Sequence, residues 1–260
     1  MTAMTYALGD SATMLRRSLR HIRRYPSMTV PLIVAPVVFL LLFVYVFGGT
    51  LGAGLGGGRS RYVDYVTPGI LLLTVAGAAT ATAVSIATDM TTGIVARFRT
   101  MAIFRPALLT GHVVGSVLQT LLGVVAVLAV AVLIGFRPDR SPVRWLAAAG
   151  ILLLLILAIT WVAVLMGLVS DSVETASNLP MLLMILPFFG SGFVPTGSMP
   201  AWLGWLAAHQ PFTPVMESLR ALLMGTPVGD TAWLAVGWCT LIITISFLGA
   251  RKLMSRPAHR

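Results

Sequence analysis

The chain has 260 residues, of which 57% are hydrophobic and only 10% are charged, and its mean hydropathy is +0.93. About a quarter of the residues in a soluble domain are charged, so this composition excludes a soluble protein and predicts an all-α protein that crosses a membrane several times. The formal net charge of +10 comes almost wholly from arginine, since Lys252 is the only lysine. Because the arginines fall at the ends of apolar runs, they indicate membrane orientation and headgroup contact rather than nucleic-acid binding.

An amphipathic helix is expected first, over residues 6–25. Its apolar positions recur every three or four residues, and most of the arginines in this segment lie off that stripe. The stripe is Leu8, Ala12, Leu15, Leu19 and Ile22. Such a helix lies in the cytoplasmic membrane interface, and Pro26 ends it before the first span. The pattern fits an anchor alone or an anchor that also contacts a partner.

Six apolar runs are long enough to cross the hydrocarbon core as helices. They are Met28–Phe47, Val66–Thr88, His112–Phe136, Val143–Val169, Ala176–Val194 and Thr231–Ala250. The fifth is the weakest, because it is short and contains Pro180 and Pro187. A cleavable signal has an apolar region of about 7–15 residues, so the first run, at about 20, is expected to remain as a span.

The orientation follows from the basic residues on each side of the membrane. With both termini in the cytoplasm, the inside segments hold 12 of the 18 basic residues and the outside loops hold 6. One inside loop contains Asp171 and Glu174 without a base, but acidic residues carry little weight in this rule. We therefore expect a multi-pass protein of the cell membrane with both termini in the cytoplasm.

Several kinds of chemistry have no sequence support. The chain lacks the GxxxxGK[ST] pattern of a phosphate-binding loop, and its GxGxxG match at residues 52–57 lies between two spans without a preceding strand. We interpret that match as a flexible turn. No histidines share a helix face at metal-ligand spacing, and Cys239 has no second cysteine to pair with. We expect neither an enzyme nor a bound cofactor or metal in this chain.

The distribution of ionisable residues bears on the energy source. Proton- and ion-coupled carriers place such residues within their spans, whereas Asp89 and Asp171 lie at span ends here and nothing ionisable lies at mid-span. A transport protein of this kind needs energy from a partner.

The segment from Gly93 to Gly111 is basic and amphipathic, and it connects two spans. One side of the expected short helix carries Ile94, Phe98, Met101 and Phe104, and the arginines project elsewhere. A soluble partner can bind such a helix in an apolar groove with an acidic rim. An ordinary basic inside loop is the alternative, and periodicity alone does not separate the two.

The segment 195–225 is too broken by prolines to span the membrane and too apolar for a free loop. Trp202 and Trp205 suit the headgroup zone, and Glu217 and Arg220 are spaced to pair on one helix face. We expect short helices that dip into the outer leaflet and act as an outer gate, with Pro195, Pro200, Trp202, Glu217 and Arg220 as its residues. A lid that only seals the bundle is the alternative.

These two segments together resemble the permease subunits of the type-2 ABC exporter family, the group that contains the daunorubicin/doxorubicin resistance permeases. The matching motifs are Gly93, Arg97-Phe98-Arg99-Thr100, Arg105 and Gly111, then Phe193-Val194-Pro195, Met199-Pro200-Ala201-Trp202, Pro211-Phe212-Thr213-Pro214 and Leu219-Arg220-Ala221-Leu222. Tyr65-Val66-Thr67-Pro68-Gly69 is similar to the family's entry to the second span. The chain departs from the pattern at Ala96, Ala102, His112 and Ser116.

The resemblance implies a single transmembrane domain over residues 1–260 with a coupling helix at 93–106. That helix would dock on a separate ATPase subunit, which binds ATP and Mg, through Gly93, Arg97, Phe98, Arg99 and Arg105. It also implies a dimer with a second copy or a related permease, embedded in membrane lipids.

The expected function is the permease subunit of an ATP-driven exporter for a hydrophobic or amphiphilic compound such as a drug, an antibiotic or a lipid. A permease for a lipid-linked polysaccharide is one alternative, and the spans' richness in Ala, Val and Leu rather than aromatic residues disfavours it. A self-contained channel or secondary carrier is another, and a non-transporting membrane component is a third.

Overall fold

The computed structural model describes residues 26–92 and 105–255, and all regular structure in these two ranges is helical. The amphipathic helix expected over 6–25 lies outside the described residues. The long helices are α2 (Pro26–Leu42), α4 (Gly58–Thr91), α6 (Arg105–Leu133), α7 (Pro142–Val169) and α12 (Thr231–Ser255). The shorter elements are η1 (Phe43–Phe47), α3 (Gly48–Gly54), α8 (Val173–Asn178), α9 (Met181–Ile185), η2 (Leu186–Phe189), η3 (Thr196–Ser198), α10 (Ala201–His209) and α11 (Phe212–Met224).

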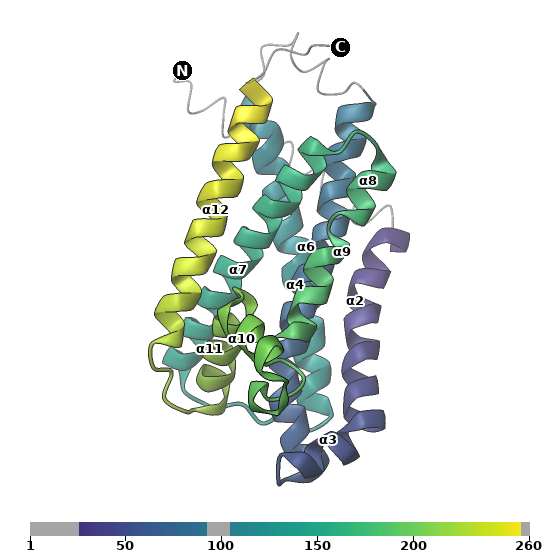
Figure 1. Ribbon diagram of the computed structural model, residues 1–260. Helices are drawn as coiled ribbons and strands as arrows, with labels where there is room; N and C mark the ends of the chain where they lie inside the picture. The colour runs from purple at the N-terminus through teal and green to yellow at the C-terminus, as the bar shows by residue number, and fades with distance from the viewer. Residues whose placement is uncertain (1–25, 93–104, 256–260) are drawn as a thin grey trace.

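The long helices run side by side (Figure 1), with α2 and α6 running in one direction along the bundle and α4, α7 and α12 in the other. The start of α2, the end of α4, the start of α6 and the end of α12 share one end of the bundle, whereas α3, α10 and α11 lie at the other. We call these the inner end and the outer end, after the orientation expected from the arginine distribution. The end of α4 and the start of α6, which flank the undescribed residues 93–104, therefore both lie at the inner end.

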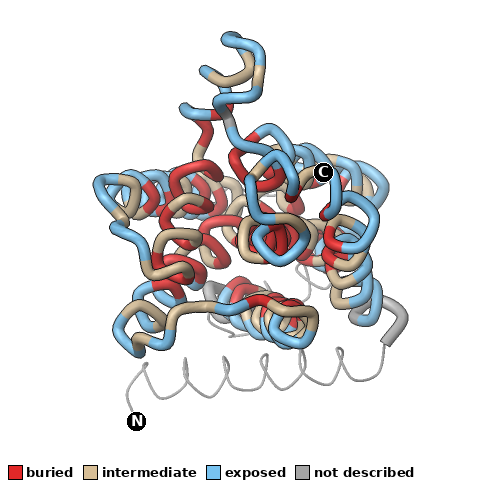
Figure 2. The backbone as a smooth tube through the Cα atoms, turned by 90° about the horizontal axis from the view of Figure 1, so that it is seen from below, coloured by how far each residue is buried: buried red, intermediate tan, exposed pale blue. Residues whose placement is uncertain are grey.

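Helix α4 forms the centre of the bundle. In the most apolar stretch of α4, 72% of the residues are buried. In the corresponding stretches of the span that contains α2 and of α12, only 17% of the residues are buried. Viewed along the bundle, buried positions gather on the inside and exposed positions face outward (Figure 2). Helices α4 and α7 approach closely at Gly167, where an added Cβ would lie 2.6 Å from the Ala83 carbonyl oxygen. The outward faces of α2 and α12 are apolar, which suits lipid or another membrane chain.

In the described ranges, five helices are long and apolar enough to cross a membrane, at Val30–Gly54, Gly58–Thr91, Leu109–Leu133, Pro142–Val169 and Thr231–Met254. These match five of the six expected spans. The remaining one, expected as a helix over Ala176–Val194, is instead a shorter apolar segment, Val173–Phe189, divided into α8, α9 and η2. Proline lacks the N–H that continues a helix, and the divisions fall at Pro180 and next to Pro187.

The glycine-rich segment after the first span is more ordered than the turn that its sequence predicts. Helix α3 includes Gly52, where an added Cβ would lie 2.2 Å from the carbonyl oxygen of Gly58. The true turn follows, with φ of +70° at Gly56 and +64° at Gly58, a backbone region that glycine adopts without a steric penalty. The GxGxxG match therefore reflects tight packing of α3 against the start of α4.

Candidate functional site

At the inner end a polar contact joins the last turn of α4 to the first turns of α6. The His112 Nε2 atom lies 2.9 Å from Asp89 Oδ2, and the two side chains are only 13% and 9% exposed. Asp89 lies two residues before the end of α4 at Thr91, and His112 lies seven residues after the start of α6 at Arg105. The pair therefore bridges the two helix ends that flank residues 93–104.

Hydroxyl contacts continue from this pair toward the middle of the bundle. The Ser85 Oγ atom lies 3.4 Å from His112 Nδ1, and one turn deeper the hydroxyls of Thr82 and Ser116 are 2.6 Å apart. The Ser116 hydroxyl lies 3.5 Å from that of Thr160 on α7. A polar ladder thus links α4, α6 and α7 over their inner halves.

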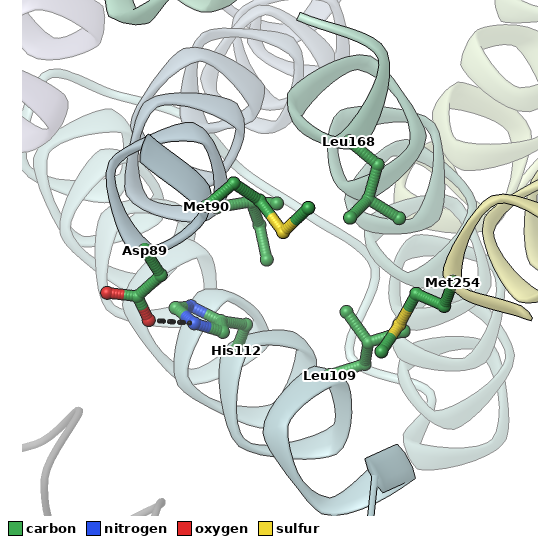
Figure 3. Close-up of a pocket in the computed structure, with 7 residues that line it drawn as sticks. Asp89, Met90, Leu109, His112, Leu168 and Met254 are labelled. Carbon is green, nitrogen blue, oxygen red and sulfur yellow. Dashed lines mark hydrogen bonds and ion pairs between the residues drawn. The ribbon is translucent and has the colours of Figure 1, made fainter. Parts of the chain in front are cut away.

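A small pocket adjoins the Asp89–His112 pair (Figure 3). Its other walls are apolar side chains from all four converging helix ends, namely Ile86, Met90, Leu109, Leu168 and Met254. Its empty space, including the part open to solvent, is about 240 Å³. Sites for drug-sized ligands occupy about 300–1,000 Å³, so this pocket in a single chain is too small for such a ligand.

Most of the residues expected to dock the ATPase fall outside the described residues. These are Gly93, Arg97, Phe98 and Arg99. Arg105 is the first residue of α6, so the expected segment 93–106 runs directly into that helix. The structure thus gives the location of the segment's two attachment points.

At the outer end Arg220 of α11 binds main-chain oxygens rather than the carboxylate of Glu217, the partner that its helical spacing predicts. The guanidinium donates to the Tyr65 carbonyl over 3.3 Å and 3.4 Å, and to the Ser191 carbonyl over 2.6 Å. Its Cζ atom lies 3.9 Å from the centre of the Tyr65 ring. The Tyr65 hydroxyl also donates to the Ser191 carbonyl, over 2.8 Å.

Burial removes water from the charged guanidinium of Arg220, and its hydrogen bonds and ring contact offset the loss of hydration. Desolvation lowers the pKa of Arg220, but an arginine in a protein remains protonated. Hydrogen bonds from a charged donor are stronger than neutral ones, and an aromatic face adds attraction for a cation. We call Arg220, Tyr65 and Ser191 the outer node. It ties α11 and α4 to the non-helical residues that follow η2.

Several other residues of the expected outer gate are more exposed than Arg220. Pro195 and Pro200 are exposed and flank η3, and Pro200 directly precedes α10. Trp202 on α10 is 70% exposed, whereas most of α11 is buried. The structure thus separates an exposed helix from a buried one within the segment 195–225.

Two buried polar atoms beneath α10 have no hydrogen-bond partner among the described residues. They are the Ser191 hydroxyl and the Gln210 side-chain oxygen. Both residues are more than nine-tenths buried, and an unpaired buried acceptor or donor costs about 1–3 kcal/mol. The outer end therefore holds polar groups that a water molecule or a polar ligand atom would stabilise.

Sequence reasoning placed Asp89 and His112 at span ends but did not pair them, and it did not connect Tyr65 to Arg220. The sequence did offer one signal, which is that each of these polar residues lies next to a long apolar run. A polar residue buried beside such a run needs a hydrogen-bond partner. The partner itself lies 23 residues away for His112 and 155 residues away for Arg220.

No group of three or more His, Cys, Asp or Glu side chains that could hold a metal ion occurs within residues 26–92 and 105–255. The polar groups of this region instead serve helix-to-helix contacts at the two ends.

Comparison with known proteins adds the family. The ABC-2 type transporter family matches residues 11–224. The chain is 28% identical over 265 residues to the daunorubicin resistance ABC transporter permease protein DrrB1 of Streptomyces coeruleorubidus, which covers 99% of this chain and 90% of that protein. It is 24% identical over 230 residues to the probable doxorubicin resistance ABC transporter permease protein DrrC of Mycobacterium tuberculosis, covering 85% and 80%. With this match across most of its length and with the helical membrane bundle described above, the chain belongs to the ABC-2 type transporter family.

Proposed function

We propose that this protein is the membrane-spanning permease subunit of an ATP-driven exporter that moves a hydrophobic or amphiphilic drug out of the cell. The observation that carries this proposal is the similarity over 99% of the chain to a daunorubicin resistance permease. Because the relatives are named for resistance to daunorubicin and doxorubicin, we take drugs of this kind as the substrate class. The protein acts in the cell membrane with both termini in the cytoplasm.

The energy comes from a separate ATPase subunit that binds ATP and Mg. The segment 93–106 docks on it, with Arg97, Phe98, Arg99 and Arg105 supplying charge and an apolar anchor. Two facts support this assignment: the segment is basic, and it attaches to the bundle between the ends of α4 and α6. Movement of the docked segment therefore reaches α4, the most buried long helix, without an intervening loop.

The active unit contains two such chains, either two copies or one copy and a related permease. The apolar outward faces of α2 and α12 support a partner in the membrane. The small pocket at the inner end supports it too, because a drug-sized path needs more room than this pocket gives. The outer gate is the segment 195–225, which contains the exposed Trp202 on α10 and the buried helix α11.

The test is affinity purification of the tagged protein in mild detergent, with partner identification and an ATPase assay. We expect an ATPase subunit at a one-to-one ratio, and doxorubicin export in cells that express both. A homo-oligomer without an ATPase would contradict the proposal and favour a channel or secondary carrier.

Charge reversal tests the docking assignment. We expect Arg97→Glu to leave the protein in the membrane but to abolish both ATPase copurification and transport, because a basic contact becomes acidic. The matched control is Arg140→Glu, an exposed arginine at the outer end, which should copurify the ATPase normally. Unchanged copurification with Arg97→Glu would refute the assignment.

A further inference from the structure

The polar ladder at the inner end has a shape that suits a mechanical role. On α4 its members are Thr82, Ser85 and Asp89, and on α6 they are His112 and Ser116. The spacings of three and four residues place each set on one face of its helix. Since both sets face each other, they join about two turns of α4 to about one turn of α6, near the base of the segment 93–104.

The Asp89–His112 contact is the contact of this ladder that includes a carboxylate. Its 2.9 Å distance and the 2.6 Å distance between the Thr82 and Ser116 hydroxyls are those of good hydrogen bonds, whereas the contacts at Ser85 and Thr160 are 3.4 Å and 3.5 Å long. The Asp89 and His112 side chains are only 9% and 13% exposed, and Met90, Leu109 and Met254 form apolar walls of the adjoining pocket (Figure 3). Low local polarity strengthens such a contact and makes the loss of one partner costly.

The location determines what the contact can do. A push or a turn applied to the segment 93–104 acts on the C-terminal end of α4 and the N-terminal end of α6. Without a cross-link, the two ends can separate and the displacement is lost within the segment. With the Asp89–His112 contact in place, they move together, and the Ser116–Thr160 contact extends this to α7.

We propose that Asp89 and His112 are positioning residues for energy coupling, which clamp α4 to α6 so that movement of the docking segment reaches the bundle as one displacement. This inference rests on the proposed function, because it needs an ATPase that moves the segment. It assigns no contact with ATP or with the transported compound to either residue.

Variants that break the clamp test it in the complex of the full-length protein with its ATPase in liposomes. We expect Asp89→Asn and His112→Gln to copurify the ATPase and hydrolyse ATP at a rate close to that of the wild type. Doxorubicin transported per ATP hydrolysed should fall roughly fivefold or more, the lower range of an allosteric coupling. The exchange Asp89→His with His112→Asp should restore most of the loss.

The matched control is Asp64→Asn, the same chemical change on the same helix at the outer end, where Asp64 accepts a hydrogen bond from the Arg137 backbone N–H. It should leave transport per ATP unchanged. An equal loss in Asp64→Asn, or a normal ratio in Asp89→Asn, would overturn the inference. A wild-type protein without an ATPase partner would instead refute the proposed function itself.

A second measurement does not depend on breaking the clamp. Spin labels at the exposed positions Thr88 and Val114 report the spacing of α4 and α6 within one labelled chain. In a complex with otherwise native side chains, this spacing should stay constant between the nucleotide-free and ATP-bound states while the helices move relative to α12. A change in the 88–114 spacing on ATP binding would overturn the inference even if the Asp89 variants failed to fold.

Discussion

The polar ladder at the inner end and the outer node use polar groups in different ways. At the inner end, side chains contact side chains across helices, as in Asp89–His112 and Thr82–Ser116. At the outer end, the Arg220 and Tyr65 side chains bind main-chain carbonyls. Side-chain contacts join helices that can still shift as units, whereas contacts to the main chain fix an irregular segment in place. The comparison indicates an inner end built to transmit movement and an outer end built to hold a shape.

The largest expected effect comes from removing the cation of the outer node. Arg220→Ala would leave the Tyr65 and Ser191 carbonyls without this donor and create a void, at a cost of about 3 kcal/mol. Thermal unfolding of the purified protein in detergent measures it. Arg220→Lys keeps the positive charge but loses the planar guanidinium group. The stability of this variant should therefore fall between that of the wild type and that of Arg220→Ala. A fully stable Ala variant would break the comparison, because the outer end would then not depend on the node.

A smaller effect is expected where α7 packs on α4 in the inner half of the bundle. The Cβ of Gly167→Ala would lie 2.6 Å from the Ala83 carbonyl and 2.8 Å from Ile86 Cβ, so the helices must separate at a cost of about 1–3 kcal/mol. The control is Gly150→Ala on the same helix, where nothing lies within 4 Å and alanine should be neutral or stabilising. Equal melting temperatures for the two variants would show that the inner helices tolerate separation.

The smallest expected effect isolates one hydrogen bond of the outer node. Tyr65→Phe removes the hydroxyl that donates to Ser191 over 2.8 Å but keeps the ring beneath Arg220. The loss should be about 1 kcal/mol, measured by the same unfolding assay. Tyr45→Phe, at an exposed tyrosine in the first span, serves as the control and should unfold like the wild type. A cost as large as that of Arg220→Ala would mean that the hydroxyl, and not the guanidinium, holds the node.

The sequence predicted the helical class and most of the architecture, because membrane spans follow from local composition. Apolar runs located five long helices, and Pro180 and Pro187 were recognised as weak points of the remaining run. The structure went further and divided that run into α8, α9 and η2. The glycine-rich turn was predicted too simply, since Gly52 is helical where α3 packs on Gly58.

The candidate sites were predicted less completely. Arg220 was expected to belong to the outer gate, and the helical i, i+3 rule assigned it to Glu217. That rule considers only neighbours on an exposed helix face. Because most of α11 is buried, the arginine reaches across to α4 and to Ser191 instead. His112 was placed at the start of the third apolar run without a partner, and its contact with Asp89 depends on how α4 and α6 pack.

The sequence by itself determined that this protein lives in a membrane, where its spans lie, which side the arginines favour and which family its motifs resemble. Each of these depends on residues close together in the chain. Only the tertiary structure decided which helix lies at the centre, that Asp89 meets His112, and that Arg220 meets Tyr65. In hydrocarbon, an apolar helix face is stabilised almost as well by lipid as by another helix. The pattern of apolar residues therefore does not specify which helices are neighbours. The partners of the polar residues can be identified only once the packing of the helices is known.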